Sequence, residues 1–138
     1  MKMENEYFLT GKIHEECGVF GVYHVSSAAS LSYFGLHALQ HRGQEAAGIA
    51  TSDGKQITCI KGKGLITEVF NNETINKMDG IHAIGHVRYS TDGGNEIENV
   101  QPIMVRAHTG HFGAVHNGQI VNASELKEDL ENQGSIFQ

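Results

Sequence analysis

Three polar groups stand where short apolar runs begin or end, and their types suit an attack on an amide. Cys17 opens one run, Arg88 follows a second, and Asn117 with Gly118 follows a third. A cysteine thiolate is a nucleophile, and an Asn side-chain amide beside a backbone N–H can hold an oxyanion. An Arg guanidinium holds a carboxylate through two parallel hydrogen bonds. Together these groups indicate hydrolysis of an amide in a substrate that carries a carboxylate.

These three groups do not include a base that could accept the proton of the Cys17 thiol. If the chain began at Cys17, its α-amine, whose reference pKa is about 7.7–8.0, could accept the thiol proton. While Glu16 is attached, that nitrogen is an amide and cannot do so. Residues 1–16 are polar and without periodicity, so they are either a frayed terminus or a segment removed in processing.

Each of these residues also has an ordinary structural interpretation. A cysteine is often a small buried hydrophobe, and an arginine is often one half of a surface ion pair of little energetic worth. Asn-Gly is a strong signal for a tight turn. The chemical interpretation is favoured only because all three occur together, whereas Cys59, inside a predicted strand, is expected to be structural.

Composition places the chain among compact α/β or α+β proteins. Its 138 residues suffice for one domain with a core, and 39% hydrophobic residues with 17 Gly and a single Pro are typical of a folded chain. A net charge of −6 disfavours nucleic acid and anionic membranes as partners. Because neither a membrane span nor a secretory signal is present, we expect a cytoplasmic protein.

Nine histidines raise the question of a metal site. His37 and His41 fall on one face of a predicted helix, and His82 and His86 on one side of a predicted strand, where histidines often line a core. No carboxylate-rich or cysteine-bearing ligand set accompanies them. We therefore expect no metal.

The elements that must position these residues are mostly short strands. Apolar runs between turn signals predict strands at 17–25, 46–52, 56–61, 81–87, 103–108, 111–116 and 119–121. Helices are predicted from Ser26 or Ser27 to about His41, at 65–70 and at 122–134, with a further helical turn within 71–79. Many strands without βαβ alternation indicate an antiparallel, layered α+β domain.

Two of the helices carry more detailed predictions. The last should be capped by Asn122 and Glu125 in a capping box, with Leu126 and Leu130 facing inward. The first should bury one stripe of residues: Leu31, Phe34, Gly35, Ala38 and Leu39.

Four stretches of the chain share a wider pattern. They are CGVFG at 17–21, LHALQHRGQE at 36–45, GHVRYST at 85–91 and HNG at 116–118. In this order they resemble the class II glutamine amidotransferases, which are N-terminal-nucleophile hydrolases. The resemblance implies a four-layer αββα sandwich with antiparallel sheets, of which only the front portion is present. It divides the chain into a leader at 1–16 and an amidotransferase domain at 17–138 that is incomplete at its C-terminal end.

The resemblance also implies roles for individual residues. Cys17 becomes the N-terminus after loss of the leader, and its thiolate attacks the side-chain amide of L-glutamine with its own α-amine as base. Asn117 and Gly118 hold the oxyanion, and Arg88 holds the glutamine α-carboxylate. The remaining substrate-binding residues flank the nucleophile or begin a loop that closes over the substrate: Arg42, Gly43, Tyr89, Ser90 and Thr91.

Three further stretches narrow the resemblance within that class. They are GKGLITEVF at 62–70, NVQP at 99–102 and GSIFQ at 134–138. With the acidic leader, they resemble the branch that passes ammonia to phosphoribosyl diphosphate at the start of purine synthesis. No cofactor is expected within this chain. Mg²⁺ with phosphoribosyl diphosphate and, in some relatives, an iron–sulfur cluster are implied for full-length enzymes, which are expected to be homo-oligomers.

Two alternatives stay open. The chain could belong to a class II amidotransferase with another acceptor, such as a sugar phosphate, aspartate or 2-oxoglutarate. It could also be an inactive truncated remnant, because the domain that binds phosphoribosyl diphosphate is absent from 1–138.

Overall fold

Four strands form one antiparallel sheet in the computed structural model, which describes residues 16–89, 97–108 and 110–136. The strand order is β1-β4-β2-β3, with β1 at Gly18–Val22, β2 at Ala46–Ser52, β3 at Ile57–Lys63 and β4 at His82–Arg88. The register sets Gly18 opposite Val87 and Ala46 opposite Arg88. The start of β1 and the end of β4 therefore meet at one end of the sheet.

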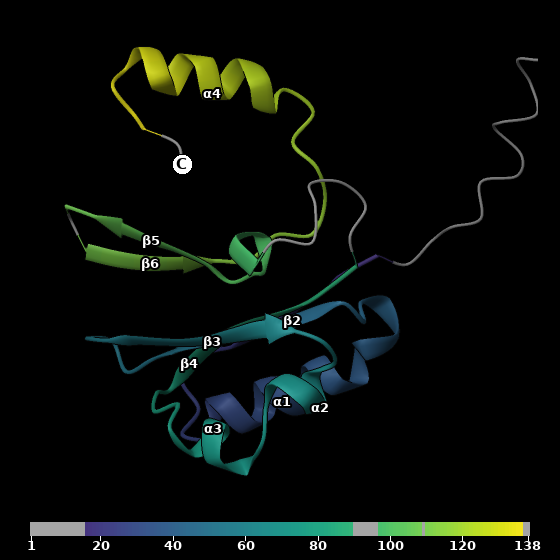
Figure 1. Cartoon of the computed structure of the whole chain (residues 1–138). Helices are drawn as coiled ribbons and strands as arrows, with labels where there is room; N and C mark the ends of the chain where they lie inside the picture. The colour runs from purple at the N-terminus through teal and green to yellow at the C-terminus, as the bar shows by residue number, and fades with distance from the viewer. Residues whose placement is uncertain (1–15, 90–96, 109, 137–138) are drawn as a thin grey trace, which may run out of the picture.

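Helices cover one face of this sheet, as Figure 1 shows. They are α1 at Ala28–Ala38, followed by a 3₁₀ turn at Gln40–Arg42, then α2 at Ile66–Val69 and α3 at Asn72–Asn76. The core between helices and sheet includes Leu36, Ile49, Ile66 and Val87, all fully buried. We call this part, residues 18–88, the inner half.

The buried stripe of α1 differs from the prediction. Leu31 and Phe34 are 42% and 65% exposed. The buried face is Ala28, Ala29, Ser32 and Leu36. Small residues let the helix lie close to the sheet: a Cβ on Gly35 would come within 2.5 Å of the Phe20 ring. The prediction is therefore wrong for Leu31 and Phe34, whereas Leu39 does pack against the core.

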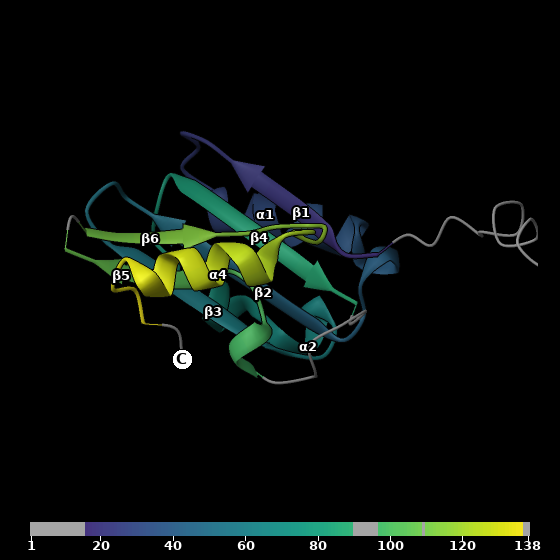
Figure 2. The same cartoon turned by 90° about the horizontal axis from the view of Figure 1, so that it is seen from above.

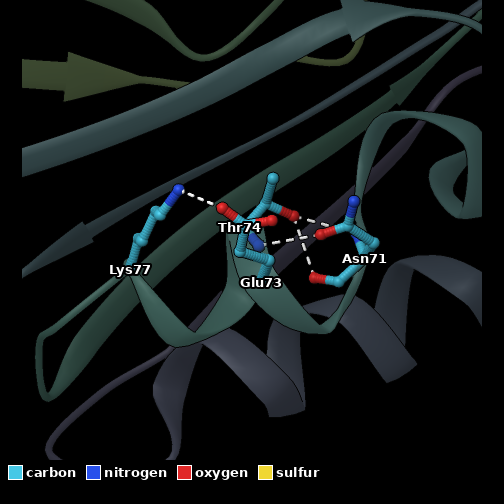
Figure 3. A network of polar contacts seen from close by, with 4 residues as sticks. All are labelled: Asn71, Glu73, Thr74 and Lys77. Atoms are coloured by element: carbon cyan, nitrogen blue, oxygen red, sulfur yellow. Dashed lines mark hydrogen bonds and ion pairs between the residues drawn. The ribbon is translucent and has the colours of Figure 1, made fainter.

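Short helix α3 owes its start to side-chain capping (Figure 3). Thr74 donates its backbone N–H to Asn71 Oδ1 at 2.9 Å, and Asn71 donates its own to Thr74 Oγ1 at 2.8 Å. These two bonds satisfy N–H groups that a helix start otherwise leaves unpaired. One turn later Lys77 pairs with Glu73 on the exposed side.

A hairpin and one helix lie on the other face of the sheet. The hairpin pairs β5 at Ile103–Ala107 with β6 at Gly110–Ala114, a 3₁₀ turn at Ile97–Asn99 precedes it, and α4 at Ala123–Asn132 follows. Figures 1 and 2 show the layers in the order helices, sheet, hairpin, α4. The predicted α+β class and the αββα layering are therefore confirmed. We call residues 97–136 the outer half.

The outer half departs from the sequence predictions in three places. Residues 119–121 form no strand and are exposed. Asn122 stands at the N-cap of α4 but makes no side-chain cap bond. Leu126 and Leu130 are 43% and 42% exposed, so they face no core among the residues that the structure describes. Residues 119–121 and the two leucines have little described structure to pack on, because β6 ends at Ala114. The missing cap bond of Asn122 goes with the φ of −109° and ψ of 31° at that residue.

The described helices include none that is long and apolar enough to cross a membrane.

Candidate active site

A cavity of about 670 Å³ opens where the sheet end meets the loop after β6. Its lining brings together residues from both halves: Glu16, Cys17, His86, Arg88, Tyr89, Asn99, Gln101, Ile103, His116, Asn117, Gly118 and Gln119. The predicted nucleophile, carboxylate ligand and oxyanion donors thus share one cavity, although they are up to 101 positions apart in the sequence. A second cavity of about 410 Å³, at the opposite end of the sheet, is mainly apolar and contains none of these groups.

Backbone contacts fix the position of Cys17. Its backbone N–H donates to the Arg42 carbonyl at 2.8 Å, and the Arg42 guanidinium returns a bond from Nε to the Cys17 carbonyl at 2.7 Å. The φ of Cys17 is 59°, a left-handed conformation that costs a non-glycine residue about 1–2 kcal/mol. Arg42 therefore acts behind the nucleophile, holding its main chain, and does not line the cavity.

The thiol of Cys17 lies against the backbone of Tyr89. Sγ is 3.5 Å from both the Tyr89 N and the Tyr89 O. The N–H can donate to a thiolate, and the carbonyl can accept from a thiol, so this residue suits both protonation states of the sulfur. The Tyr89 side chain is 50% exposed.

Arg88 is the last residue of β4, on the face of the sheet turned towards the outer half. It is 9% exposed, so burial restricts the number of positions that its guanidinium can take. Gly43 lies directly behind it: a Cβ there would come within 2.7 Å of the Val87 and Arg88 backbone. The absence of a side chain at Gly43 therefore allows its backbone to pack closely against the end of β4. Gly43 is buried and does not line the cavity.

The predicted oxyanion donors lie across the cavity from the sheet. Asn117 Nδ2 is 3.5 Å from the Cys17 carbonyl oxygen, so the amide is turned towards the nucleophile. Gly118 has a φ of +130°, a conformation that side chains disfavour. His116 precedes this pair. Its backbone N–H donates to the side-chain amide of Gln101, and its carbonyl accepts from the same amide.

His86, which the sequence predicts only as a histidine that lines the core, also lines this cavity. It is 1% exposed, and neither ring nitrogen has a hydrogen-bond partner among the described residues. Burial first, and the positive charge of Arg88 second, lower its pKa to about 4, and the nearby His116 backbone offsets part of this shift. The alternation of β4 could have placed it in the site, because His86 and Arg88 are two apart and share a face.

The remaining predicted residues are placed as follows. Ser90 and Thr91 lie outside the described residues, as does most of the predicted leader. Cys59 lies in β3, where burial raises the pKa of its thiol, in keeping with a structural residue. No cluster of three metal-ligating side chains occurs in the part of the chain that the structure describes.

Known proteins resemble this chain in sequence. No family model matches it. Amidophosphoribosyltransferase of Bacillus subtilis is 56% identical over 127 residues, which are 91% of this chain and 27% of that protein. The enzymes of the same name from Methanocaldococcus jannaschii and Staphylococcus aureus are 53% and 48% identical, over 88% and 91% of this chain and 26% of each relative.

Solved structures resemble it in fold. One, described as the allosteric regulatory enzyme of purine biosynthesis, has a TM-score of 0.81 and 55% identity, over 87% of this chain and 26% of its own. Another, glutamine phosphoribosylpyrophosphate amidotransferase from B. subtilis complexed with ADP and GMP, has a TM-score of 0.78 and 54% identity over the same shares. The chain spans about a quarter of the length of these relatives. By sequence and by fold, this chain is similar to the N-terminal part of the amidophosphoribosyltransferases.

Proposed function

We propose that this chain is the glutamine-hydrolysing part of an amidophosphoribosyltransferase. The observation that carries the proposal is the convergence of Cys17, Arg88, Asn117 and Gly118 on one cavity. These residues supply a nucleophile, a carboxylate ligand and two oxyanion donors, which are the groups that hydrolysis of a glutamine amide requires.

Maturation at Cys17 comes first. Cleavage of the Glu16–Cys17 peptide bond converts an amide nitrogen into an amine with a lone pair. That nitrogen already donates to the Arg42 carbonyl, and an amine can keep this bond while accepting the thiol proton. Glu16 itself lines the cavity, so removal of the leader also makes room for substrate.

The reaction then follows from the positions of the groups. The Cys17 thiolate attacks the side-chain amide carbon of glutamine, and the electron pair of the C=O moves onto its oxygen. Asn117 Nδ2 and the Gly118 N–H stabilise this oxyanion. The C–N bond breaks, the nitrogen takes the proton from the α-amine and leaves as ammonia, and water hydrolyses the glutamyl thioester to glutamate.

Arg88 orients the substrate by binding its α-carboxylate. The bond that the Glu45 N–H donates to the Arg88 carbonyl at 3.0 Å holds the main chain of Arg88 at the end of β4, and burial restricts its guanidinium. A held guanidinium can form two bonds to the glutamine α-carboxylate with little further loss of side-chain entropy.

The ammonia acceptor is proposed from the relatives. The curated proteins named above are all amidophosphoribosyltransferases, which disfavours another acceptor. We propose phosphoribosyl diphosphate, bound with Mg²⁺ by a part of the enzyme outside this chain, and phosphoribosylamine as the product. A cytoplasmic location and a homo-oligomeric full-length enzyme remain predictions.

Substitution of the two cysteines tests the proposal. In the polypeptide expressed from its natural gene, Cys17→Ala should reduce ammonia release from glutamine to background and abolish labelling by a glutamine-directed electrophile. Cys59→Ala is the matched control and should change ammonia release by less than about twofold, because Cys59 is a half-buried residue outside the cavity. Unchanged ammonia release by Cys17→Ala, or no release by the unsubstituted protein, would overturn the proposal.

A further inference from the structure

Gln101 forms an unusual pair with the residue that precedes the oxyanion donors. Its Nε2 donates to the His116 carbonyl at 3.0 Å, and its Oε1 accepts from the His116 N–H at 2.5 Å. In an antiparallel β-sheet, the two residues of a hydrogen-bonded pair exchange two backbone bonds in the same way. The side-chain amide of Gln101 therefore stands in for a neighbouring strand just after β6 has ended at Ala114.

The backbone of Gln101 is in turn anchored to the inner half. Lys61 on β3 donates from Nζ to the Val100 carbonyl at 2.5 Å and to the Pro102 carbonyl at 3.3 Å. Val100 and Pro102, on either side of Gln101, are buried. The chain here is pressed against β2 at Gly48, where an added Cβ would lie 2.1 Å from the Gln101 carbonyl oxygen.

These contacts form a continuous path from the sheet to the oxyanion donors. Gly48 and Lys61 fix the segment at 100–102, and the Gln101 amide fixes His116. The next two residues are Asn117 and Gly118. Cys17 lies at the end of the same sheet, so the path sets the distance between the nucleophile and the donors that must meet its oxyanion.

We propose that Gln101 is a positioning residue for the oxyanion hole. It acts through the His116 backbone and keeps the Gly118 N–H and Asn117 Nδ2 aimed at the place where negative charge develops. The inference rests on the proposed glutamine hydrolysis and deepens it.

An oxyanion forms after substrate has bound, so its stabilisation affects the turnover step more than binding. A displacement of about 1 Å in such a site can cost about 10²-fold in rate. Alkylation of a thiolate by iodoacetamide is a displacement at a saturated carbon and creates no oxyanion. The two reactions of Cys17 therefore separate a displaced oxyanion hole from a damaged nucleophile.

The test is made in the natural-length protein, matured at Cys17. Gln101→Ala should lower kcat for glutamine hydrolysis by about 10- to 100-fold. KM for glutamine should stay within about threefold, and the rate of Cys17 alkylation by iodoacetamide within about twofold. Gln101→Glu keeps the acceptor for the His116 N–H and loses the donor to its carbonyl, so it should lose an intermediate amount of kcat. Gln56→Ala, at an exposed turn residue outside the cavity, should leave all three quantities unchanged.

The outcomes are distinguishable. Loss of kcat with intact alkylation supports the inference. A kcat within twofold of the unsubstituted protein, or an equal loss of alkylation, overturns it while the proposed function stands. If Gln101→Ala does not fold, kcat and the alkylation rate of Gln101→Glu are judged by the same criteria. An unsubstituted protein that releases no ammonia overturns the proposed function instead.

Discussion

The inner and outer halves hold their parts of the candidate site by different means. In the inner half, two long strand pairings and a continuous core fix Cys17 and Arg88 at the end of the sheet. In the outer half, α4 has no buried residue, and Val121 and Ile136 are 101% and 89% exposed. There the proposed oxyanion donors follow His116, which is held by two hydrogen bonds to the Gln101 side chain.

Substitutions in the two parts of the site should therefore have different effects. A core is cooperative, so damage to it lowers the stability of the whole half. A single hydrogen bond contributes only about 0.5–1.5 kcal/mol net, so damage to the outer half should change geometry and turnover more than stability. Matched substitutions in the two halves make this difference measurable.

A pair of leucines should give the largest contrast in stability. Leu36→Ala removes a fully buried side chain from α1 and should cost about 2–5 kcal/mol. Leu126→Ala, on α4, removes a side chain that is 43% exposed and should cost less than about 1 kcal/mol. Urea unfolding of the 138-residue chain measures both. Similar losses for the two variants would show that α4 is packed in solution.

Acid should destabilise the inner half through His86. Its pKa is about 4 in the folded protein, against 6.5 ordinarily, because of burial and of the Arg88 charge. Between these pH values His86 binds a proton in the unfolded chain but not in the folded protein. The free energy of unfolding therefore falls as the pH drops from 6.5 to 4.

Replacing His86 isolates this effect. In His86→Gln the difference in unfolding free energy between pH 7 and pH 4.5 should be smaller by on the order of 2 kcal/mol. His111→Gln, at an exposed position on β6, is the control and should change the difference little. An identical pH dependence in His86→Gln and the unsubstituted chain would contradict the burial of a neutral imidazole.

The helix caps should give the smallest contrast. Asn71→Ala removes the reciprocal cap of α3 (Figure 3) and should cost about 1 kcal/mol. Asn122→Ala, at the corresponding position of α4, removes no cap bond and should cost about 0–0.3 kcal/mol. Thermal unfolding resolves this difference, and an equal cost at both positions would count against the arrangement at the start of α4.

How far the sequence predicts the structure also differs between the halves. Residues 46–52 form the strand expected of them, because a continuous apolar run between turn signals has few other solutions. Residues 119–121 do not, because a short apolar run becomes a strand only where a neighbour pairs with it. The Asn122 cap was expected from residue type alone, whereas capping depends on the backbone angles at that one position.

The site shows the same division. Cys17, Arg88, Asn117 and Gly118 were found by chemical type and by resemblance, and they do meet at one cavity. The sequence indicates Gln101 only as part of the NVQP stretch at 99–102, without a role of its own. Its contact with His116 joins residues that are 15 positions apart. The local sequence around either residue does not predict this contact, so only the folded structure shows it.

We propose that Cys17 hydrolyses glutamine with its own α-amine as the base. Intact-mass measurement of the protein while it releases ammonia from glutamine tests this claim most directly. We expect the active species to lack residues 1–16 and to carry the glutamyl group on Cys17 during turnover. An active species that still contains Met1 to Glu16 would contradict it.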